Sequence, residues 1–453
     1  MEFIDYEKEF DTKDIQGVIE RFSAGSLNDG EKIQVHGVIH RIRHMSGFAF
    51  VIIRSPRILF QCVWEENTSQ VDLKQFSTED CVNIEGTVVF EERSKLGFDI
   101  RIDKMEKLSG AAEQIPIEIS NDKKVAALQL NTLLDHRIIT LRSSRVRAAI
   151  KLGEGVMHAF RDFLDDENFT EFVPPRIVQA GAEGGADMFE VDYFGEKAYL
   201  NQSPQMYKQI MVGAFSKVYT VGPIFRGEKH STNRHINEFQ GLDIEMGFID
   251  SFEDIMELEA RLFKYMFRYL NENYAYELDI LLGRDKRLPE LTKFPKVRFS
   301  EVKDMYAKAN NVPVDNPNDL CPDEEKWIGE YFMSEYNAPI VFITHYPSAK
   351  RPFYTMDDPQ DPDVTLSYDM LLYGLEVTTG GQRIHDYDMQ VEKMKQRNMD
   401  IADFEDYLTM HKYGMPPHGG FGLGLERIVQ RLVGFENIRE VTAFPRDRER
   451  LRP

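Results

Sequence analysis

Short runs of apolar residues alternate with polar ones near the N-terminus of the chain. Turn-forming pairs such as Ser46-Gly47 and Ser55-Pro56 separate the runs, as is typical of β-strands. Residues 14–22, which precede the runs, place apolar side chains at helical spacing and predict an opening helix. The expected strands cover residues 33–39, 48–53, 58–64, 82–90 and 98–102.

Five short strands in succession predict a small β-barrel. An OB-fold is the natural candidate, because that fold binds oligonucleotides on its strand face. Residues 40–64 contain four arginines and no acidic side chain, which is compatible with a polyanionic partner. A barrel that serves only as a scaffold would show the same strand pattern, so this segment alone leaves nucleic-acid binding open.

The pattern changes after the barrel segment. A long amphipathic helix is expected to begin near Ser143, and strands and glycine-rich loops follow it, with helices near 253–273, 391–397 and 401–412. This mixture predicts an α+β domain around a largely antiparallel sheet with flanking helices. We therefore expect a barrel domain with its helix over 1–109, a polar connector over 110–135 and the α+β domain over 136–453.

Net charge, cysteine spacing and the lengths of apolar runs limit the classes of function and the cellular location. The formal net charge of −21 argues against a generic nucleic-acid binder, whose footprint would be basic. The three cysteines are widely spaced and fit a reducing cytosol, and the acidic start of the chain does not resemble a signal peptide. No apolar run approaches the ~20 residues that span a bilayer. We therefore expect a cytoplasmic protein that does not enter a membrane.

Three separated segments of the larger domain carry the candidate chemistry. The first, residues 168–178, would on its own be a helix-to-strand junction. The second, 218–246, predicts a strand, a polar loop with two arginines, two histidines and a lysine, and a returning strand. Arg226 and Glu228 are expected on one face at the strand period of two. A solvated loop is one interpretation, but ionised groups in a sheet are costly unless paired or bound to a ligand, which favours a polyphosphate site.

The third segment, residues 416–429, is glycine-rich and opens a helix. It matches neither the Walker pattern nor the Rossmann fingerprint. We expect its glycines to let the backbone pack closely against a flat ligand, while Arg427 supplies the charge.

These three segments resemble motifs 1, 2 and 3 of the class II aminoacyl-tRNA synthetases. The runs 202–209, 241–246, 380–386 and 444–448 narrow the resemblance to aspartyl-tRNA synthetases of the archaeal and eukaryotic type (subclass IIb), over nearly the whole chain. The resemblance implies a homodimeric ligase, with Pro175 at the dimer interface, an anticodon-binding OB-fold and a catalytic domain. Such an enzyme activates L-aspartate with ATP and Mg²⁺ and transfers it to the 3′ end of tRNA(Asp).

Carried over residue by residue, the resemblance implies an ATP site. Arg226 would bridge the α-phosphate of ATP and the α-carboxylate of aspartate, and Arg427 would bind the γ-phosphate. Glu228 would contact the adenine and Phe239 would stack on it. The remaining ATP-binding residues implied by the resemblance are Gly227, Arg234, His235, Ile236, Glu376, Gly424, Leu425 and Glu426.

The same resemblance implies a metal site and an aspartate site. Asp369 and Glu376 fall where the family holds Mg²⁺, and Thr379 falls at a position that is usually serine, so it keeps a hydroxyl for metal or substrate. Glu183 lies in the loop that would close over the substrate ammonium, and Gln205 belongs to the expected aspartate site.

Lys208 and Arg383 would both reach the side chain of the substrate, and two cations there favour a carboxylate. Asp243 would orient Lys208. We expect a site built with unpaired cations, in which a neutral amide in place of the carboxylate would leave buried charges uncompensated. Aspartate is therefore expected in preference to asparagine.

In the barrel, the resemblance places Phe50 and Gln61 where anticodon bases are stacked and read; a stacked base contributes ~1–3 kcal/mol. The alternative for Phe50 is a side chain of the barrel core. His40 and Lys95 fall near the third anticodon base, and His40 stands where strictly tRNA(Asp)-specific relatives can carry tryptophan. We hypothesise that tRNA(Asn) is charged as well as tRNA(Asp).

The sequence departs from the family pattern at three places: Asn168 replaces a glycine, Gly227 an alanine, and Ala182 the serine or threonine before Glu183. None of these changes removes a proposed catalytic group. Two alternatives remain, an asparagine–tRNA ligase and a non-catalytic RNA-binding paralogue. Retention of Arg226, Arg383 and Arg427 disfavours the paralogue.

Overall fold

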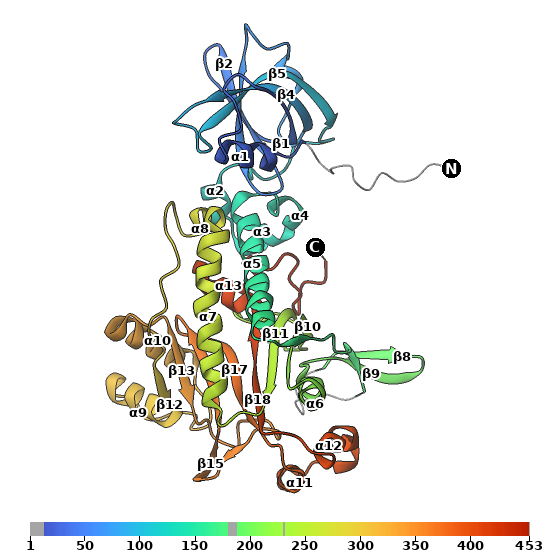
Figure 1. Ribbon diagram of the computed structural model, residues 1–453, viewed down its shortest axis with the longest axis vertical. Coiled ribbons are helices and arrows are strands. Elements are labelled where there is room, and N and C mark those ends of the chain that lie inside the picture. The colour runs from blue at the N-terminus through green and yellow to red at the C-terminus, as the bar shows by residue number, and fades with distance from the viewer. Residues whose placement is uncertain (1–12, 180–187, 230–231, 453) are drawn as a thin grey trace. The chain divides into compact units, whose positions relative to one another are not determined.

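The computed structural model describes residues 13–179, 188–229 and 232–452 (Figure 1). The chain divides into two compact units, one up to Ala127 and one from Leu128 onward. The division lies inside the segment expected to be a connector. No helix in the described ranges combines the length and apolar character that a membrane crossing requires.

The first unit is a closed five-stranded barrel with the strand order β1-β2-β3-β5-β4, which confirms the predicted OB-fold. In β2 every second residue is buried, as a strand with one face on a barrel interior requires. The opening helix α1 (Ile15–Ser23) begins after Asp14, whose side chain accepts a hydrogen bond from the backbone N–H of Gln16. The strands are β1 (Lys32–His44), β2 (Phe48–Arg54), β3 (Leu59–Glu65), β4 (Cys81–Phe90) and β5 (Phe98–Ser109), with η1 (Leu73–Gln75) before β4 and α2 (Asp122–Ala126) after the barrel.

Two barrel strands run past their predicted ends. β1 continues beyond Ile39 through a register shift between Ile39 and Arg41, and β5 continues beyond Ile102 to Ser109. Most residues in these extensions are not buried, so the alternation of apolar and polar residues that marks a strand is absent there.

The second unit is built on an eight-stranded sheet with the order β12-β13-β16-β17-β18-β11-β10-β6. The five inner pairings are antiparallel, but both edge pairings, β12 with β13 and β10 with β6, are parallel. The sheet is therefore largely antiparallel, as predicted, and parallel only in its two edge pairings. Its strands are β12 (Lys296–Arg298), β13 (Ile340–Thr344), β16 (Ser367–Leu372), β17 (Leu375–Arg383), β18 (His418–Gly424), β11 (Glu238–Gly247), β10 (Lys217–Phe225) and β6 (Thr170–Glu171).

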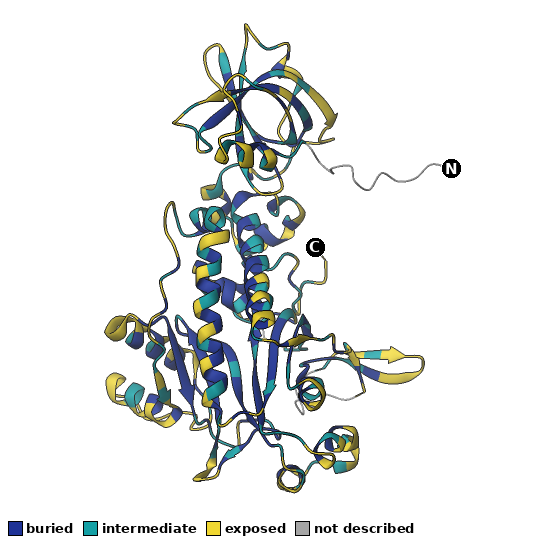
Figure 2. Ribbon diagram, viewed as in Figure 1, coloured by how far each residue is buried: buried dark blue, intermediate teal, exposed yellow. Residues whose placement is uncertain are grey.

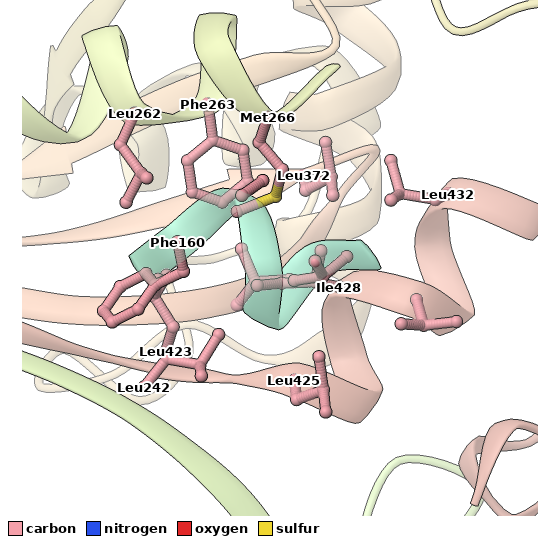
Figure 3. Close-up of a cluster of buried hydrophobic side chains, with 14 of the residues drawn as sticks. Phe160, Leu242, Leu262, Phe263, Met266, Leu372, Leu423, Leu425, Ile428 and Leu432 are labelled. Atoms are coloured by element: carbon pink, nitrogen blue, oxygen red, sulfur yellow. The ribbon is translucent and has the colours of Figure 1, made fainter. Parts of the chain in front are cut away.

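Three helices, α5 (Ser144–Asp166), α7 (Glu253–Asn273) and α13 (Leu425–Val433), cover one face of this sheet. Figure 2 shows buried residues concentrated along the sheet and on the inward sides of α5 and α7. Figure 3 shows Phe263 and Met266 pointing from α7 toward side chains of the sheet and of α13. Burying a side chain of this size contributes about 1.5–3 kcal/mol, so this layer holds the strands in place.

Smaller elements surround the sheet. A three-stranded sheet has the order β7-β9-β8, and a two-stranded one pairs β14 with β15. The elements are α3 (Leu130–Asp135), α4 (Arg137–Thr140), β7 (Ile177–Val178), β8 (Glu190–Tyr193), β9 (Glu196–Leu200), α6 (Gln205–Phe215), α8 (Ala275–Leu281), α9 (Phe299–Asn310), α10 (Pro322–Tyr336), β14 (Asp357–Asp358), β15 (Asp361–Thr365), α11 (Tyr387–Gln396), η2 (Ile401–Phe404), α12 (Glu405–Lys412) and η3 (Ile438–Val441).

Candidate active site and barrel surface

A cavity of about 430 Å³ opens on the sheet face opposite the helices. The alternation in β11 shows why: Leu242 and Ile244 belong to the hydrophobic core, whereas Gly241 and Asp243 line the cavity. Nearly all the residues proposed for ATP, metal and aspartate line it, although they lie far apart in the sequence.

One end of the cavity holds Lys208 and Arg383, both almost fully buried. Lys208 lies one turn after Gln205 on α6, so both side chains face β11. Lys208 Nζ donates to Asp243 Oδ1 at 3.1 Å and to the carbonyl oxygen of Phe421 at 3.0 Å. Arg383 Nε donates to Glu245 Oε1 at 2.9 Å, and its NH2 donates to Gln205 Oε1 at 3.3 Å.

Glu245 links these two cations. Its side chain is fully buried, and its Oε2 lies 3.4 Å from Lys208 Nζ while its Oε1 accepts from Arg383. Burial alone would raise the pKa of Glu245, but Arg383 and then Lys208 lower it below the usual value, so the carboxylate is charged. The expectation of unpaired cations is therefore wrong. Two cations face two carboxylates, Asp243 and Glu245, before any ligand enters.

The glycines of β18 make room for these acids. A side chain at Gly420 would overlap Glu245, and a Cβ at Gly422 would lie 2.8 Å from Asp243 Oδ1. Both glycines pair with β11 directly across the ladder. The glycine-rich segment thus makes close contact with buried carboxylates of the protein, in addition to lining the cavity at Gly422 and Gly424.

Arg226 and Phe239 lie together in the middle part of the site. The Arg226 guanidinium lies 5.5 Å from the centre of the Phe239 ring. β10 ends at Phe225, so Arg226 and Glu228 lie in the following loop and not, as predicted, on a strand face. Asn237 holds that loop: its Nδ2 donates to the carbonyl oxygens of Arg226 and Glu228 at 2.6 and 3.1 Å.

A second charged group surrounds Arg427. Its NH1 donates to the carbonyl oxygen of Glu376 at 3.0 Å and lies 3.7 Å from the Glu376 carboxylate. Arg234 NH1 donates to Glu325 Oε2 at 2.9 Å. Burial, followed by the charge of Glu376, raises the pKa of Glu325 to about 7. Sequence reasoning did not single out Glu325, because it lies in α10, outside the three motifs.

His235 lies near this cluster, since the charges of Arg427, Arg234 and Glu376 all act on it. Its Nε2 lies 3.7 Å from Glu228 Oε2. Burial lowers the pKa of His235. The negative charge of Glu228 opposes this shift, and the positive charges of Arg427 and Arg234 reinforce it. The ring is therefore neutral at neutral pH and can serve as a hydrogen-bonding group beside a ligand.

The proposed metal ligands lie on neighbouring strands. Asp369 pairs with Thr379 across the ladder, and Thr379 Oγ1 donates to Glu376 Oε1 at 3.2 Å. Asp369 Oδ1 accepts from the buried Arg351 NH2 at 2.8 Å. Within the described ranges no cluster of three or more His, Cys, Asp or Glu is arranged to hold a metal. Two carboxylates and a hydroxyl instead fit a hard cation that keeps water and phosphate oxygens among its ligands.

A few predicted residues lie elsewhere. The side chain of Leu425 packs in the hydrophobic core, and neither Leu425 nor Gly227 is among the residues that line the cavity. Glu426 does line the cavity: its carboxylate accepts from the backbone N–H of Gln240, and burial raises its pKa to about 7. Glu183 lies outside the described residues.

The barrel carries a polar and aromatic surface. Phe50 is only half-buried, and the Arg43 guanidinium lies 5.2 Å from its ring centre. Arg43 NH2 donates to Gln61 Oε1 at 3.1 Å, and Gln61 Nε2 donates to Asp99 at 3.2 Å. Phe50 is therefore not a barrel-core side chain, whereas its neighbours Ala49 and Val51 are fully buried.

His40 differs from the expectation of a surface residue. It is only 4% exposed, and its Nδ1 lies 3.3 Å from Arg54 NH1. Arg54 also donates both terminal nitrogens to Glu79, at 2.7 and 2.8 Å. Lys95, in contrast, is exposed in the turn between β4 and β5. Arg54 and Glu79 thus offer one route by which the buried His40 can act on a bound RNA.

Comparison with known proteins identifies both units. The family model for class II tRNA synthetases (D, K and N) matches residues 129–448, and the model for OB-fold nucleic acid binding domains matches residues 33–108. The chain is 40% identical to the aspartate–tRNA(Asp/Asn) ligase of Thermus thermophilus and 37% identical to the aspartate–tRNA(Asp) ligase of Pyrococcus abyssi. Each alignment covers 94% of this chain and 97% of the relative.

Solved structures share the fold. The asparaginyl-tRNA synthetase from Pyrococcus horikoshii, complexed with asparaginyl-adenylate, matches with a TM-score of 0.84 and 32% identity, over 94% of this chain and 97% of that one. A putative aspartyl-tRNA synthetase from Leishmania major matches with a TM-score of 0.84 and 27% identity, over 96% and 94%.

Proposed function

The chain belongs to the class II aminoacyl-tRNA synthetases of the aspartate, lysine and asparagine group, and we propose that it is an ATP-dependent aspartate–tRNA ligase of the cytoplasm. The observation that carries the choice of substrate is the pair Lys208 and Arg383 at one end of the cavity, joined by Glu245. The similarity to aspartate–tRNA ligases over 94% of the chain supports it.

The proposed chemistry has two steps and needs no nucleophile from the protein. The α-carboxylate of aspartate attacks the α-phosphorus of ATP in line, and pyrophosphate leaves. The terminal ribose hydroxyl of the tRNA then attacks the carbonyl of the adenylate and releases AMP. Positioning and neutralisation of charge supply most of the catalysis in such a reaction.

Arg226 suits the centre of this reaction because it lines the same cavity as Lys208, Arg383 and Arg427. In the proposal it binds the α-phosphate and the substrate α-carboxylate together. Phe239 stacks on the adenine, and Glu228, His235 and Ile236 surround it with the backbone of Gly227. Arg427 and Arg234 bind the terminal phosphates beside Gly424 and Glu426.

Asp369, Glu376 and Thr379 are proposed to hold Mg²⁺. When bound, Mg²⁺ would neutralise phosphate charge and hold the triphosphate in place. The role of the chain is to present these oxygens: burial raises the pKa of Asp369 against the opposing charge of Arg351, and the nearby charge of Glu376 raises it further. A cation beside the two carboxylates would relieve that repulsion.

The aspartate site is proposed to use Lys208 and Arg383 for the side-chain carboxylate, with Asp243, Gln205 and Thr379 around them. Because Glu245 already pairs with both cations, an entering carboxylate must share them. Arg383 is suited to this because its planar guanidinium can bind two carboxylates at once. Glu183 is proposed to contact the substrate ammonium.

ATP–pyrophosphate exchange without tRNA tests the proposal. With Mg²⁺ present we expect exchange with aspartate and at least about 10²-fold less with asparagine at equal concentrations, because a carboxylate offers two acceptor oxygens to Lys208 and Arg383, whereas an amide replaces one of them with a donor. Exchange with asparagine in preference to aspartate would instead identify an asparagine–tRNA ligase. Absence of exchange with both would favour the non-catalytic paralogue.

The barrel, residues 1–109, is proposed to bind the anticodon of tRNA(Asp) through Phe50 and Gln61, with residues 110–135 as the connector to the catalytic domain. The half-buried ring of Phe50 and the Arg43 guanidinium above it offer a stacking surface. A homodimer is proposed through the segment around Pro175, where the neighbouring Val173 is 88% exposed and Ile177 is 48% exposed.

Charging of tRNA(Asn) is proposed as a second activity of the same site, with His40 and Lys95 near the third anticodon base. His40→Trp is expected to lower kcat/KM for tRNA(Asn) relative to tRNA(Asp) by at least about tenfold, which equals about 1.4 kcal/mol. The indole cannot occupy the buried site of His40 without moving Arg54 away from Glu79.

Aminoacylation of the two tRNA transcripts by the native enzyme and by His40→Trp measures this ratio. His158→Trp, an exposed change on α5 of the other unit, is the matched control. If the native enzyme and His40→Trp both charge tRNA(Asp) alone, with equal kinetics, the hypothesis is wrong.

A further inference from the structure

Arg137 is a buried cation that the proposed reaction does not use. It opens α4 and is only 1% exposed. Its Nε donates to the carbonyl oxygen of Ala443 at 2.9 Å, and its NH2 donates to the carbonyl oxygens of Thr442 and Glu440 at 2.5 and 3.1 Å. Burial lowers the pKa of Arg137 to about 10, which leaves the guanidinium charged at neutral pH.

These carbonyls belong to a segment, residues 437–447, that runs from η3 toward the C-terminus. The positive charge of Arg137 lies against the C-terminal carbonyls of η3 and the residues after it, where the backbone dipoles are negative. One guanidinium thus fixes a stretch of backbone that has no regular secondary structure after Val441.

The same segment holds the loop after β10. The backbone N–H of Ile438 donates to the carbonyl oxygen of Asn233 at 2.9 Å, and the N–H of Asn237 donates to the carbonyl oxygen of Arg446 at 2.7 Å. Arg439 NH1 donates to the carbonyl oxygen of Thr232 at 2.8 Å. Between Thr232 and Asn237, the loop is therefore held to residues 437–447 by these three hydrogen bonds.

That stretch of loop supplies Arg234, His235 and Ile236 to the cavity, and Ile438 of the segment lines the cavity too. The side chains of Lys208 and Arg383 instead form hydrogen bonds to residues of α6, β11 and β18. Among the described residues, the hydrogen bonds of the segment thus reach the loop that carries Arg234 and His235, whereas those of Lys208 and Arg383 go to other elements.

We propose that Arg137 is a positioning residue for the nucleotide: by fixing residues 439–443 it holds the loop that places Arg234 and His235 at the triphosphate end of the site. This inference rests on the proposed use of ATP. Loss of Arg137 lets the loop move away from the phosphates while the aspartate end keeps its geometry. Small displacements of binding groups have large kinetic effects.

The test compares Arg137→Met and Arg137→Lys with the native protein in pyrophosphate exchange. Methionine retains the length of the side chain without a donor, so we expect the KM for ATP to rise about ten- to hundredfold, with the KM for aspartate changed less than about twofold. Lysine keeps the charge but cannot serve both the Nε and the NH2 positions, so a smaller rise is expected.

Leu270→Ala in α7 is the matched control. Leu270 is fully buried against α5, so its loss destabilises the fold without touching the segment. We expect both KM values of this variant to stay native. If the Arg137 variants raise both KM values equally, change neither, or behave like Leu270→Ala, the inference is overturned.

Hydrogen exchange supplies a readout that does not need activity. The amides of Ile438 and Asn237 are expected to exchange faster in both Arg137 variants than in Leu270→Ala, because these two bonds tie the loop to the segment. Unchanged protection there would also overturn the inference. Failure of the native protein to catalyse exchange would contradict the proposed function instead, and the amide measurement would still test the contact.

Discussion

Arg383→Leu is expected to lower kcat/KM for aspartate in pyrophosphate exchange by about 10⁴-fold, because a buried site that recognises a charged group loses that much when its partner is removed. Arg383 supplies the planar donors at the aspartate end, and leucine fills the space without replacing a hydrogen bond. The KM for ATP is expected to change far less, since Arg226, Phe239 and Arg427 lie in other segments.

The same variant should lose stability. It leaves Glu245 buried with Lys208 as its nearest remaining cation, and breaking a buried ion pair from one side costs about 3–5 kcal/mol. The double variant Glu245→Gln with Arg383→Leu removes the uncompensated charge. It should therefore recover much of the stability but none of the activity.

Urea denaturation and exchange kinetics on the three proteins separate these effects. Arg397→Leu is the control, because Arg397 is half-buried and donates to the carbonyl oxygen of Ser348, outside the cavity. Its kinetics should be native. Retention of aspartate exchange within tenfold by Arg383→Leu would show that Arg383 does not bind the substrate.

Glu259 is expected to make folding stability depend on pH. It lies on α7, fully buried, and accepts a hydrogen bond from Tyr368 Oη at 2.7 Å. Burial, with a smaller contribution from the charge of Asp369, raises the pKa of Glu259 to about 8 against the hydrogen bond from Tyr368. A carboxyl whose pKa is raised in the folded state stabilises it fully below the unfolded pKa of about 4.5, and that stability is lost as the pH rises to about 8.

Glu259→Gln removes this titration and keeps the shape. The stability of the variant relative to the native protein is therefore expected to increase by up to about 1.4 kcal/mol per pH unit, on the order of 2–3 kcal/mol between pH 5.5 and 7.5. Urea unfolding of both proteins at these two pH values measures it. The exposed Glu190→Gln on β8 is the control, and an equal pH dependence for Glu259→Gln and the native protein would contradict the argument.

The sequence predicted most accurately those helices and strands whose apolar residues recur at regular spacing. Apolar spacing located α7 at residues 253–273, and alternation located the barrel strands, because both elements bury one continuous face. Alternation fails where strands are exposed, as in the outer part of β5, and at the parallel edges, since the pairing of β6 with β10 depends on residues far apart in the chain.

The candidate site was predicted chiefly through motif resemblance, which finds residues that touch ligands better than residues that touch other side chains. Glu245 could have been found, since it follows Asp243 by two positions on a strand and so shares its face. Glu325 could not, because its approach to Arg234 depends on where α10 packs. The burial of His40 was hidden for a similar reason, because the buried pair of Arg54 and Glu79 is not visible in the sequence.

The glycines of β18 limit how this protein can change its amino-acid preference. Because Gly420 and Gly422 lie against the acids of β11, a larger residue at either position collides with Glu245 or Asp243. Single substitutions at these glycines of β18 are therefore expected to disrupt the buried acids and not to change the amino-acid preference. A change of preference toward another substrate side chain is instead expected to arise at Gln205, Lys208 and Arg383. These residues line the cavity from α6 and from the end of β17.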